Sequence, residues 1–175
     1  MDKIATTQRF FDEEIRAVAI DVLSWCRERD ILIGTGESLT GGLLAGLLTS
    51  IPGASDTYAG GIIAYQSTEK ELLLDVSHEL LREFGPVSEQ CAEAMVRGVQ
   101  KRCKVGLALA TTGVAGPTSD ERGTAVGTVY FGCALRDRAR IFAYHFDPSV
   151  GRPGIRRATI IRGLRDSLAF INTSV

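Results

Sequence analysis

The stretch from Gly34 to Lys70 constrains the fold more than any other part of the chain. It contains two segments in which an apolar run gives way to a polar turn that can start a helix. The first turn follows Ile31–Ile33 and reads GTGESLTGG, and the second follows the run that begins at Tyr58 and reads QSTEK. Ligands of α/β proteins gather where strands end and helices begin. The stretch therefore predicts an α/β protein with a site built on these two turns.

The rest of the chain alternates between helical and strand periodicity. Helices are expected at residues 8–29, after the capping hydroxyls of Thr40, Ser67, Ser77 and Ser88, and from Pro153 to about Leu168. Strands are expected at Ile31–Thr35, Tyr58–Tyr65, Val105–Thr112, Val126–Leu135 and Ala139–Phe146. The last two strands form a hairpin, so the sheet must contain an antiparallel pair. The pattern predicts one domain over residues 1–175, a three-layer α/β/α sandwich with a mixed, mainly parallel sheet, and a flexible start at residues 1–7.

Composition excludes several classes of protein. Apolar residues make up 45% of the chain, enough for a core without disulfides. The 20 basic and 21 acidic residues nearly balance, which argues against a nucleic-acid surface. The four cysteines are scattered without a C-x-x-C pair, so we expect reduced core thiols and no metal site. No run is long enough to span a membrane and no signal peptide is evident, so we expect a cytoplasmic protein.

Lys70 is the most informative ionisable residue. If it is desolvated near the edge of the sheet, its pKa falls and the neutral amine can act as a base. A hydroxyl within reach then becomes the nucleophile. Ser38 and Ser55 are both candidates, and their spacing does not separate them. The histidines, His78 and His145, fall in a surface helix and a strand register, which disfavours a Ser-His-Asp triad.

Further polar groups are candidates for substrate contacts. Glu37 can orient the lysine or a substrate hydroxyl, or bind main-chain amides. Thr112 and Gly113 end the central strand, where the threonine hydroxyl can bind substrate or its oxyanion. The last helix begins with several arginines, among them Arg156. The N-terminus of a helix favours anions and not cations, so an anionic ligand is one explanation for these arginines. The glycines of Thr40-Gly41-Gly42 leave first-turn amides open to an anion.

An ordered set of short motifs resembles one known family. The motifs are ESLTGG at 37–42, IPGAS at 51–55, Tyr65 followed by Lys70, GPVSE at 85–89, TGVAGP at 112–117 and VGTV at 126–129. Together they resemble the CinA carboxy-terminal domain family, the nicotinamide-nucleotide amidohydrolases, over residues 10–172. The chain is similar to the stand-alone form of that domain.

The resemblance implies a hydrolase of the pyridine nucleotide cycle that needs no cofactor or metal. It would convert nicotinamide mononucleotide (NMN) to nicotinate mononucleotide and ammonia by a Ser/Lys-type mechanism. The family's catalytic positions fall on Ser38, Ser55, Tyr65, Lys70 and Thr112, with Tyr65 as a proton relay or orienting group. The substrate phosphate would lie near the amides of Thr40–Gly42 or near the terminal arginines. The family also implies a homodimer.

Two segments depart from the family pattern and support an alternative. Gln66-Ser67 follows the tyrosine where the family often has an asparagine, and Thr118–Asp120 replaces a glycine pair. The alternative is a nucleotide-binding module with altered catalysis, or an interaction protein of DNA uptake or damage response.

Overall fold

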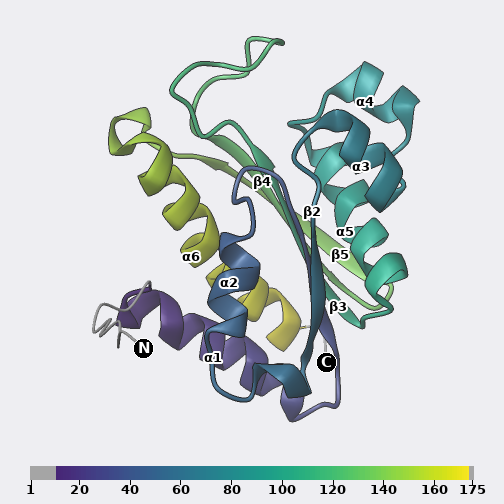
Figure 1. The fold of residues 1–175 in the computed structure, drawn as a ribbon, viewed down its shortest axis with the longest axis vertical. Helices are drawn as coiled ribbons and strands as arrows, with labels where there is room; N and C mark the ends of the chain where they lie inside the picture. Colours follow the sequence, from purple (N-terminus) through teal and green to yellow (C-terminus); the bar gives the residue numbers. More distant parts are fainter. Residues whose placement is uncertain (1–10, 174–175) are drawn as a thin grey trace, which may run out of the picture.

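The computed structural model describes residues 11–173, so the predicted flexible start at residues 1–7 lies outside the described part (Figure 1). The helices are α1 Glu13–Arg27, α2 Leu43–Thr49, α3 Ser67–Leu74, α4 His78–Phe84, α5 Glu89–Cys103 and α6 Gly151–Asn172. The strands are β1 Ile33–Glu37, β2 Tyr58–Ile63, β3 Leu107–Gly113, β4 Thr128–Leu135 and β5 Arg138–His145. Short 3-10 turns at Ala54–Asp56 and Pro148–Val150 precede β2 and α6. The predicted order of elements is confirmed.

The five strands form one mixed sheet in the order β2-β1-β3-β4-β5. β1 lies between β2 and β3 and is parallel to both, whereas β3–β4 and β4–β5 are antiparallel pairs. The predicted mixed α/β sheet is confirmed, with its pairings divided equally between the two kinds. β1 is buried along its whole length, as expected of a strand covered on both faces.

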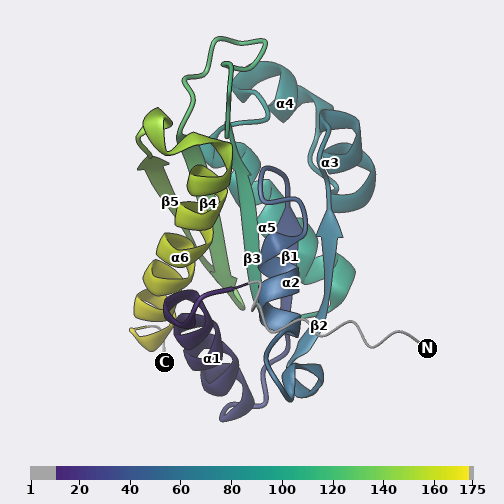
Figure 2. The ribbon, with the colours of Figure 1, turned by 60° about the vertical axis from the view of Figure 1, so that its left-hand side comes forward.

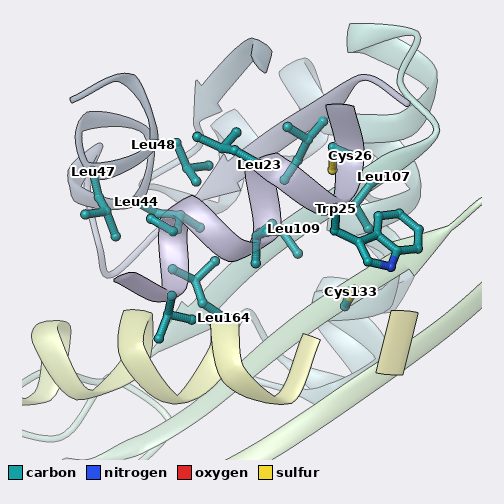
Figure 3. Close-up of a cluster of buried hydrophobic side chains, with 14 of the residues drawn as sticks. Leu23, Trp25, Cys26, Leu44, Leu47, Leu48, Leu107, Leu109, Cys133 and Leu164 are labelled. Atoms are coloured by element: carbon teal, nitrogen blue, oxygen red, sulfur yellow. The ribbon is translucent and has the colours of Figure 1, made fainter. Parts of the chain in front are cut away.

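Helices cover both faces of the sheet, with α1, α2 and α6 on one side and α3, α4 and α5 on the other (Figures 1 and 2). The first layer buries the larger core, in which α1 and α2 leucines meet strand residues such as Leu109 and Cys133 (Figure 3). The second layer packs α5 side chains, including Met95 and Val99, on the alanines of the sheet. These two cores establish the predicted three-layer sandwich.

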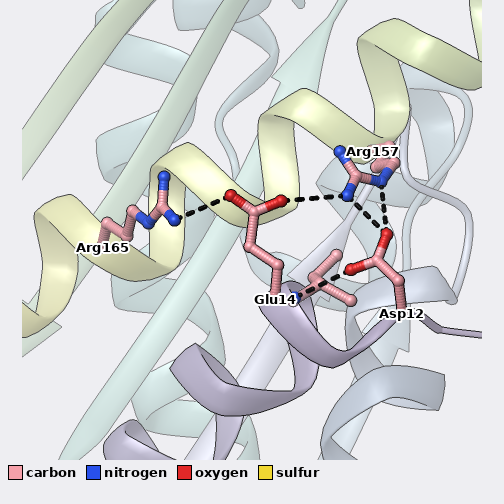
Figure 4. A network of polar contacts seen from close by, with 5 residues as sticks. Asp12, Glu14, Arg157 and Arg165 are labelled. Atoms are coloured by element: carbon pink, nitrogen blue, oxygen red, sulfur yellow. Dashed lines mark hydrogen bonds and ion pairs between the residues drawn. The ribbon is translucent and has the colours of Figure 1, made fainter.

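Salt bridges join the first and last helices across the surface of the first layer (Figure 4). Arg157 Nε of α6 donates to Asp12 Oδ2 at 3.1 Å, and Arg165 Nη2 donates to Glu14 Oε1 at 2.9 Å. Asp12 also caps α1 by accepting from the main-chain N–H of Ile15 at 3.1 Å. Exposed pairs of this kind each contribute about 0–1 kcal/mol, so they mainly fix the register of the two helices.

Helix starts follow the predicted serine caps at α4 and α5. Ser77 Oγ accepts from the N–H of Leu80, and Ser88 Oγ accepts from the N–H of Cys91. Within residues 11–173, none of the helices combines the length and the apolar character that a membrane crossing needs.

Candidate active site

Ser38 and Lys70 meet at the end of β1. Ser38 directly follows the last residue of that strand, and Lys70 lies in the first turns of α3. The Lys70 Nζ lies 3.0 Å from Ser38 Oγ and 3.1 Å from the main-chain oxygen of Ala64. A distance of 3.0 Å allows proton transfer between the hydroxyl and the amine in either direction. These two atoms form a serine–lysine pair of the kind that nucleophilic catalysis uses.

Burial gives this lysine unusual acid–base properties. Lys70 is only 2% exposed, although lysine is almost never fully buried in proteins. Loss of hydration lowers the pKa of its amine below the ordinary value, and the neighbouring Cys91 side chain opposes this shift to a smaller extent. In the described part of the chain no carboxylate pairs with the Lys70 amine, so burial is not compensated by an opposite charge. Burial therefore shifts the protonation equilibrium of Lys70 toward the neutral, basic form.

The carboxylate of Glu37 shapes the turn that carries Ser38. It is 1% exposed and accepts from the main-chain N–H groups of Gly42, Leu44 and Ala45 at 2.9, 3.1 and 2.8 Å. Of its sequence-predicted roles, binding of main-chain amides is the one observed. The carboxylate provides a negative charge at the start of α2 and leaves those amides without room for a ligand anion.

A hydroxyl group and a main-chain oxygen of Thr111 in β3 contact the same turn. Thr40 Oγ1 lies 2.7 Å from Thr111 Oγ1 in a fully buried pair, so the predicted cap of α2 by Thr40 is wrong. The main-chain N–H of Ser38 donates to Thr111 O at 3.0 Å, which ties the turn to β3. Thr112 Oγ1 donates to the Pro86 carbonyl, so its hydrogen is not directed at an oxyanion.

A pocket of about 720 Å³ opens above the serine–lysine pair. Strand ends, α3, α4, the loop 114–127 and the start of α6 contribute its walls. Sequence-predicted residues in its lining are Ser38, Tyr65, Lys70, Thr112 and Gly113. The volume lies within the range typical of small-molecule sites. The five residues come from three separate parts of the chain, and the fold brings them to a single cavity.

Tyr65 and Arg152 form one side of this pocket. Tyr65 is 51% exposed, and its hydroxyl accepts a hydrogen bond from Arg152 Nη2. Arg152 Nη1 also donates to the Gly116 carbonyl at 2.9 Å. One guanidinium therefore connects the segment after β2, the loop 114–127 and α6.

Other predicted site residues lie elsewhere. Ser55 is exposed in the turn before β2, and the pairing of Tyr58 with Ile33 puts that turn at the opposite end of the strands from Ser38. Thr40, Gly41 and Gly42 do not line the pocket: Thr40 pairs with Thr111, and the N–H of Gly42 donates to Glu37. Arg156 Nη2 donates to the Thr40 carbonyl at 2.6 Å and supports the turn from outside the pocket.

Sequence reasoning did not assign several polar residues that line the pocket: His78, Arg82, Asp120, Arg122 and Arg152. Arg152 belongs to the arginine cluster noticed in the sequence, but spacing gave no reason to choose it over Arg156. His78 and Arg82 lie in α4, whose placement over the strand ends depends on tertiary packing. In the described residues no group of three or more His, Cys, Asp or Glu side chains is arranged to hold a metal ion.

Comparison with known proteins places the chain among relatives of one kind. It is 40% identical over 124 residues to a CinA-like protein of Pseudothermotoga lettingae, which covers 69% of this chain and 30% of that protein. It is 34% identical over 159 residues to a CinA-like protein of Parasynechococcus marenigrum, which covers 91% of this chain and 38% of that protein. The chain thus spans about a third of the length of these curated relatives.

Solved structures agree with the sequence comparison. The competence/damage inducible protein CihA from Agrobacterium tumefaciens superposes with a TM-score of 0.87 at 32% identity, covering 93% of this chain and 98% of that one. A competence-damaged protein (CinA) superfamily protein from Enterobacter cloacae gives a TM-score of 0.82 at 25% identity and 99% coverage of both chains. Residues 15–170 match the family described as the CinA C-terminal domain. The chain therefore belongs to the CinA C-terminal domain family.

Proposed function

We propose that the chain is an amidohydrolase that deamidates nicotinamide mononucleotide, with Ser38 as nucleophile and Lys70 as general base. The observation that carries this proposal is the 3.0 Å distance between Lys70 Nζ and Ser38 Oγ, at the floor of a pocket large enough for a nucleotide. The carboxamide and the nucleotide class of substrate come from the family resemblance. The acid–base chemistry rests on the buried lysine.

Acylation begins when the Ser38 oxygen attacks the carboxamide carbon and its proton passes to the Lys70 amine. The resulting ammonium then donates that proton to the nitrogen as the C–N bond breaks, and ammonia leaves. Ser38 is now held as an ester of the nicotinate group. Burial assists both proton transfers of this step. Lys70 must be neutral before it can accept the Ser38 proton, and an ammonium whose pKa is lowered donates its proton more readily to the leaving nitrogen.

Deacylation reverses the roles of the same two residues. Water attacks the ester carbon, its proton passes to Lys70, and the C–O bond to Ser38 breaks. Lys70 returns a proton to the Ser38 oxygen, which regenerates the starting pair and releases the carboxylic acid. Tyr65, held by Arg152, lies in the same pocket and is suited to orient the substrate or relay a proton.

The decisive experiment measures ammonia release from the mononucleotide by wild-type protein and by Ser38→Ala and Ser55→Ala variants. Loss of either group of a cooperating nucleophile–base pair lowers kcat by about 10³-fold or more. We expect that loss for Ser38→Ala, and at most a two-fold change for the exposed Ser55. Equal loss in both variants, or no ammonia from wild-type protein, would overturn the proposal. Stabilisation by nucleotide without ammonia release would instead identify a binding module.

A further inference from the structure

Two arginines line the pocket without any part in the chemistry proposed for Ser38 and Lys70. Arg82 lies in α4, and Arg122 lies in the loop 114–127 that faces it. Both line the same cavity as the serine–lysine pair. A guanidinium in a pocket is suited to bind phosphate or carboxylate, because it combines a fixed charge with several N–H donors.

Arg122 is anchored on the end of α4. Its Nη2 donates to the main-chain oxygen of Arg82 in the last turn of that helix, where a positive charge is favoured. Gly85 makes room for this contact, because a Cβ there would lie 2.7 Å from Arg122 Nη1. The bond uses one of five guanidinium donors, so the anchored group retains capacity for a ligand.

Arg82 is exposed at the same site. Within residues 11–173, its guanidinium has no hydrogen bond or salt bridge to another residue. Two carboxylates that share the pocket contact other groups: Glu71 lies 3.3 Å from His78 Nδ1, and Asp120 Oδ1 accepts from the N–H groups of Arg122 and Thr124, while Asp120 Oδ2 is buried without a hydrogen-bond partner among the described residues. Glu121, also in the lining, is exposed to solvent.

The other cations near the start of α6 are engaged within the protein. Arg156 binds the Thr40 carbonyl, and Arg157 binds Asp12. Arg152 bridges Tyr65 and Gly116. The start of α2, the other expected anion site, is occupied by the carboxylate of Glu37.

We propose that Arg82 and Arg122 form the subsite that holds the phosphate of a phosphorylated substrate. The substrate therefore extends from the carboxamide at Ser38 to a phosphate monoester against the end of α4. This inference deepens the proposed function and rests on it for the position of the carboxamide. In this arrangement, Arg82 of α4 and Arg122 of the loop 114–127 are the residues that distinguish phosphorylated from unphosphorylated ligands.

The test compares wild-type protein with Arg82→Ala, Arg82→Lys and the remote control Arg140→Ala, whose arginine lies on β5. Steady-state rates are measured with nicotinamide mononucleotide and with nicotinamide riboside, which lacks the phosphate. For Arg82→Ala we expect KM for the mononucleotide to rise about ten-fold, as for loss of one charge-assisted hydrogen bond, with kcat changed less than two-fold. KM for the riboside should not change, and Arg82→Lys should restore part of the loss.

An equilibrium arm separates this inference from the proposed amidase activity. Thermal unfolding is followed with and without inorganic phosphate and nicotinate mononucleotide, neither of which can be deamidated. Stabilisation of wild type and Arg140→Ala that is lost in Arg82→Ala supports the subsite, even if no ammonia is ever released. Equal stabilisation of Arg82→Ala and wild type, or none of wild type, overturns it.

Discussion

Glu37 Oε1 accepts a hydrogen bond from the main-chain N–H of Ala45 at 2.8 Å, eight residues further along the chain. With the bonds from Gly42 and Leu44, this contact folds the segment between β1 and α2 around one carboxylate. Ser38 is the residue next to that carboxylate in the chain. The position of the proposed nucleophile therefore depends on a side chain that never touches the pocket.

Replacing Glu37 by Gln should destabilise the fold and reduce activity. One carboxylate oxygen becomes an NH₂ group, which cannot accept from the amides, so a buried N–H is left unpaired. The expected loss is roughly 1–3 kcal/mol in the free energy of unfolding. Urea denaturation of Glu37→Gln beside the exposed control Glu93→Gln measures it. Equal stability of the two variants would contradict the importance of these bonds.

Lys70→Met should separate stability from catalysis. The buried amine is desolvated without a carboxylate partner in the described residues, and methionine of similar length avoids that penalty. We expect an unfolding free energy within about 1 kcal/mol of wild type, or higher, together with loss of ammonia release. The exposed Lys101→Met is the matched control and should retain activity. A strongly destabilised Lys70→Met would show that the amine is structural.

The lowered pKa of Lys70 predicts a pH dependence of the reaction. The base is active when neutral, so kcat/KM should rise with pH and level off at an apparent pKa below the ordinary lysine value of 10.5. A pH–rate profile measured from pH 6 upward at constant ionic strength checks this. A kcat/KM that continued to rise through pH 10.5 without a plateau would count against a lysine of lowered pKa as the base.

The same shift predicts a pH-dependent difference in stability. Between the lowered pKa and 10.5 the unfolded chain holds the Lys70 proton and the folded protein does not. The contribution of Lys70 to the free energy of unfolding therefore increases as pH rises through that window. This contribution is lost as pH falls through the pKa that Lys70 has in the folded protein. The unfolding free energy of wild type minus that of Lys70→Met should rise with pH in the same interval. A flat difference would show that burial does not shift this amine.

Gly98→Ala should disturb the site from a distance. A Cβ at Gly98 of α5 would lie 2.1 Å from the carbonyl oxygen of Leu74, the last residue of α3. The added methyl must push α3, and with it Lys70, away from the sheet, at a cost of about 1–3 kcal/mol and with reduced kcat. Gly46→Ala is the control, since its nearest neighbour is 4.0 Å away and alanine favours a helix. Similar thermal shifts in both variants would refute this packing argument.

Much of the fold follows from local pattern, since strand and helix periodicities are properties of neighbouring residues. Ser77 and Ser88 illustrate this, because a cap is decided within three residues of the helix start. Thr40 fails the same rule because a carboxylate three residues earlier reaches over it to the amides of α2. The competing acceptor could be found only once the turn had been folded.

Some features of the site depend on the direction of the strands and can be predicted from the sequence. Others depend on how the helices pack and cannot. Ser38 follows a strand and Ser55 precedes one, so parallel strands separate them to opposite ends of the sheet. That distinction was present in the order of elements. The choice of Arg152 over Arg156 depends on how α6 crosses the sheet, and the four-residue spacing leaves both on one helix face.

The hydrogen bond between Tyr65 and Arg152 joins residues 87 positions apart. During synthesis on the ribosome, β1 and α3 emerge long before α6, so Ser38 and Lys70 are available for pairing while the wall supplied by Arg152 does not yet exist. The chain therefore completes its proposed reaction chamber only with its final helix. A protein that ends before residue 151 lacks both the pocket wall that Arg152 supplies and the α6 side chains of the first-layer core, among them Leu164 and Ile171.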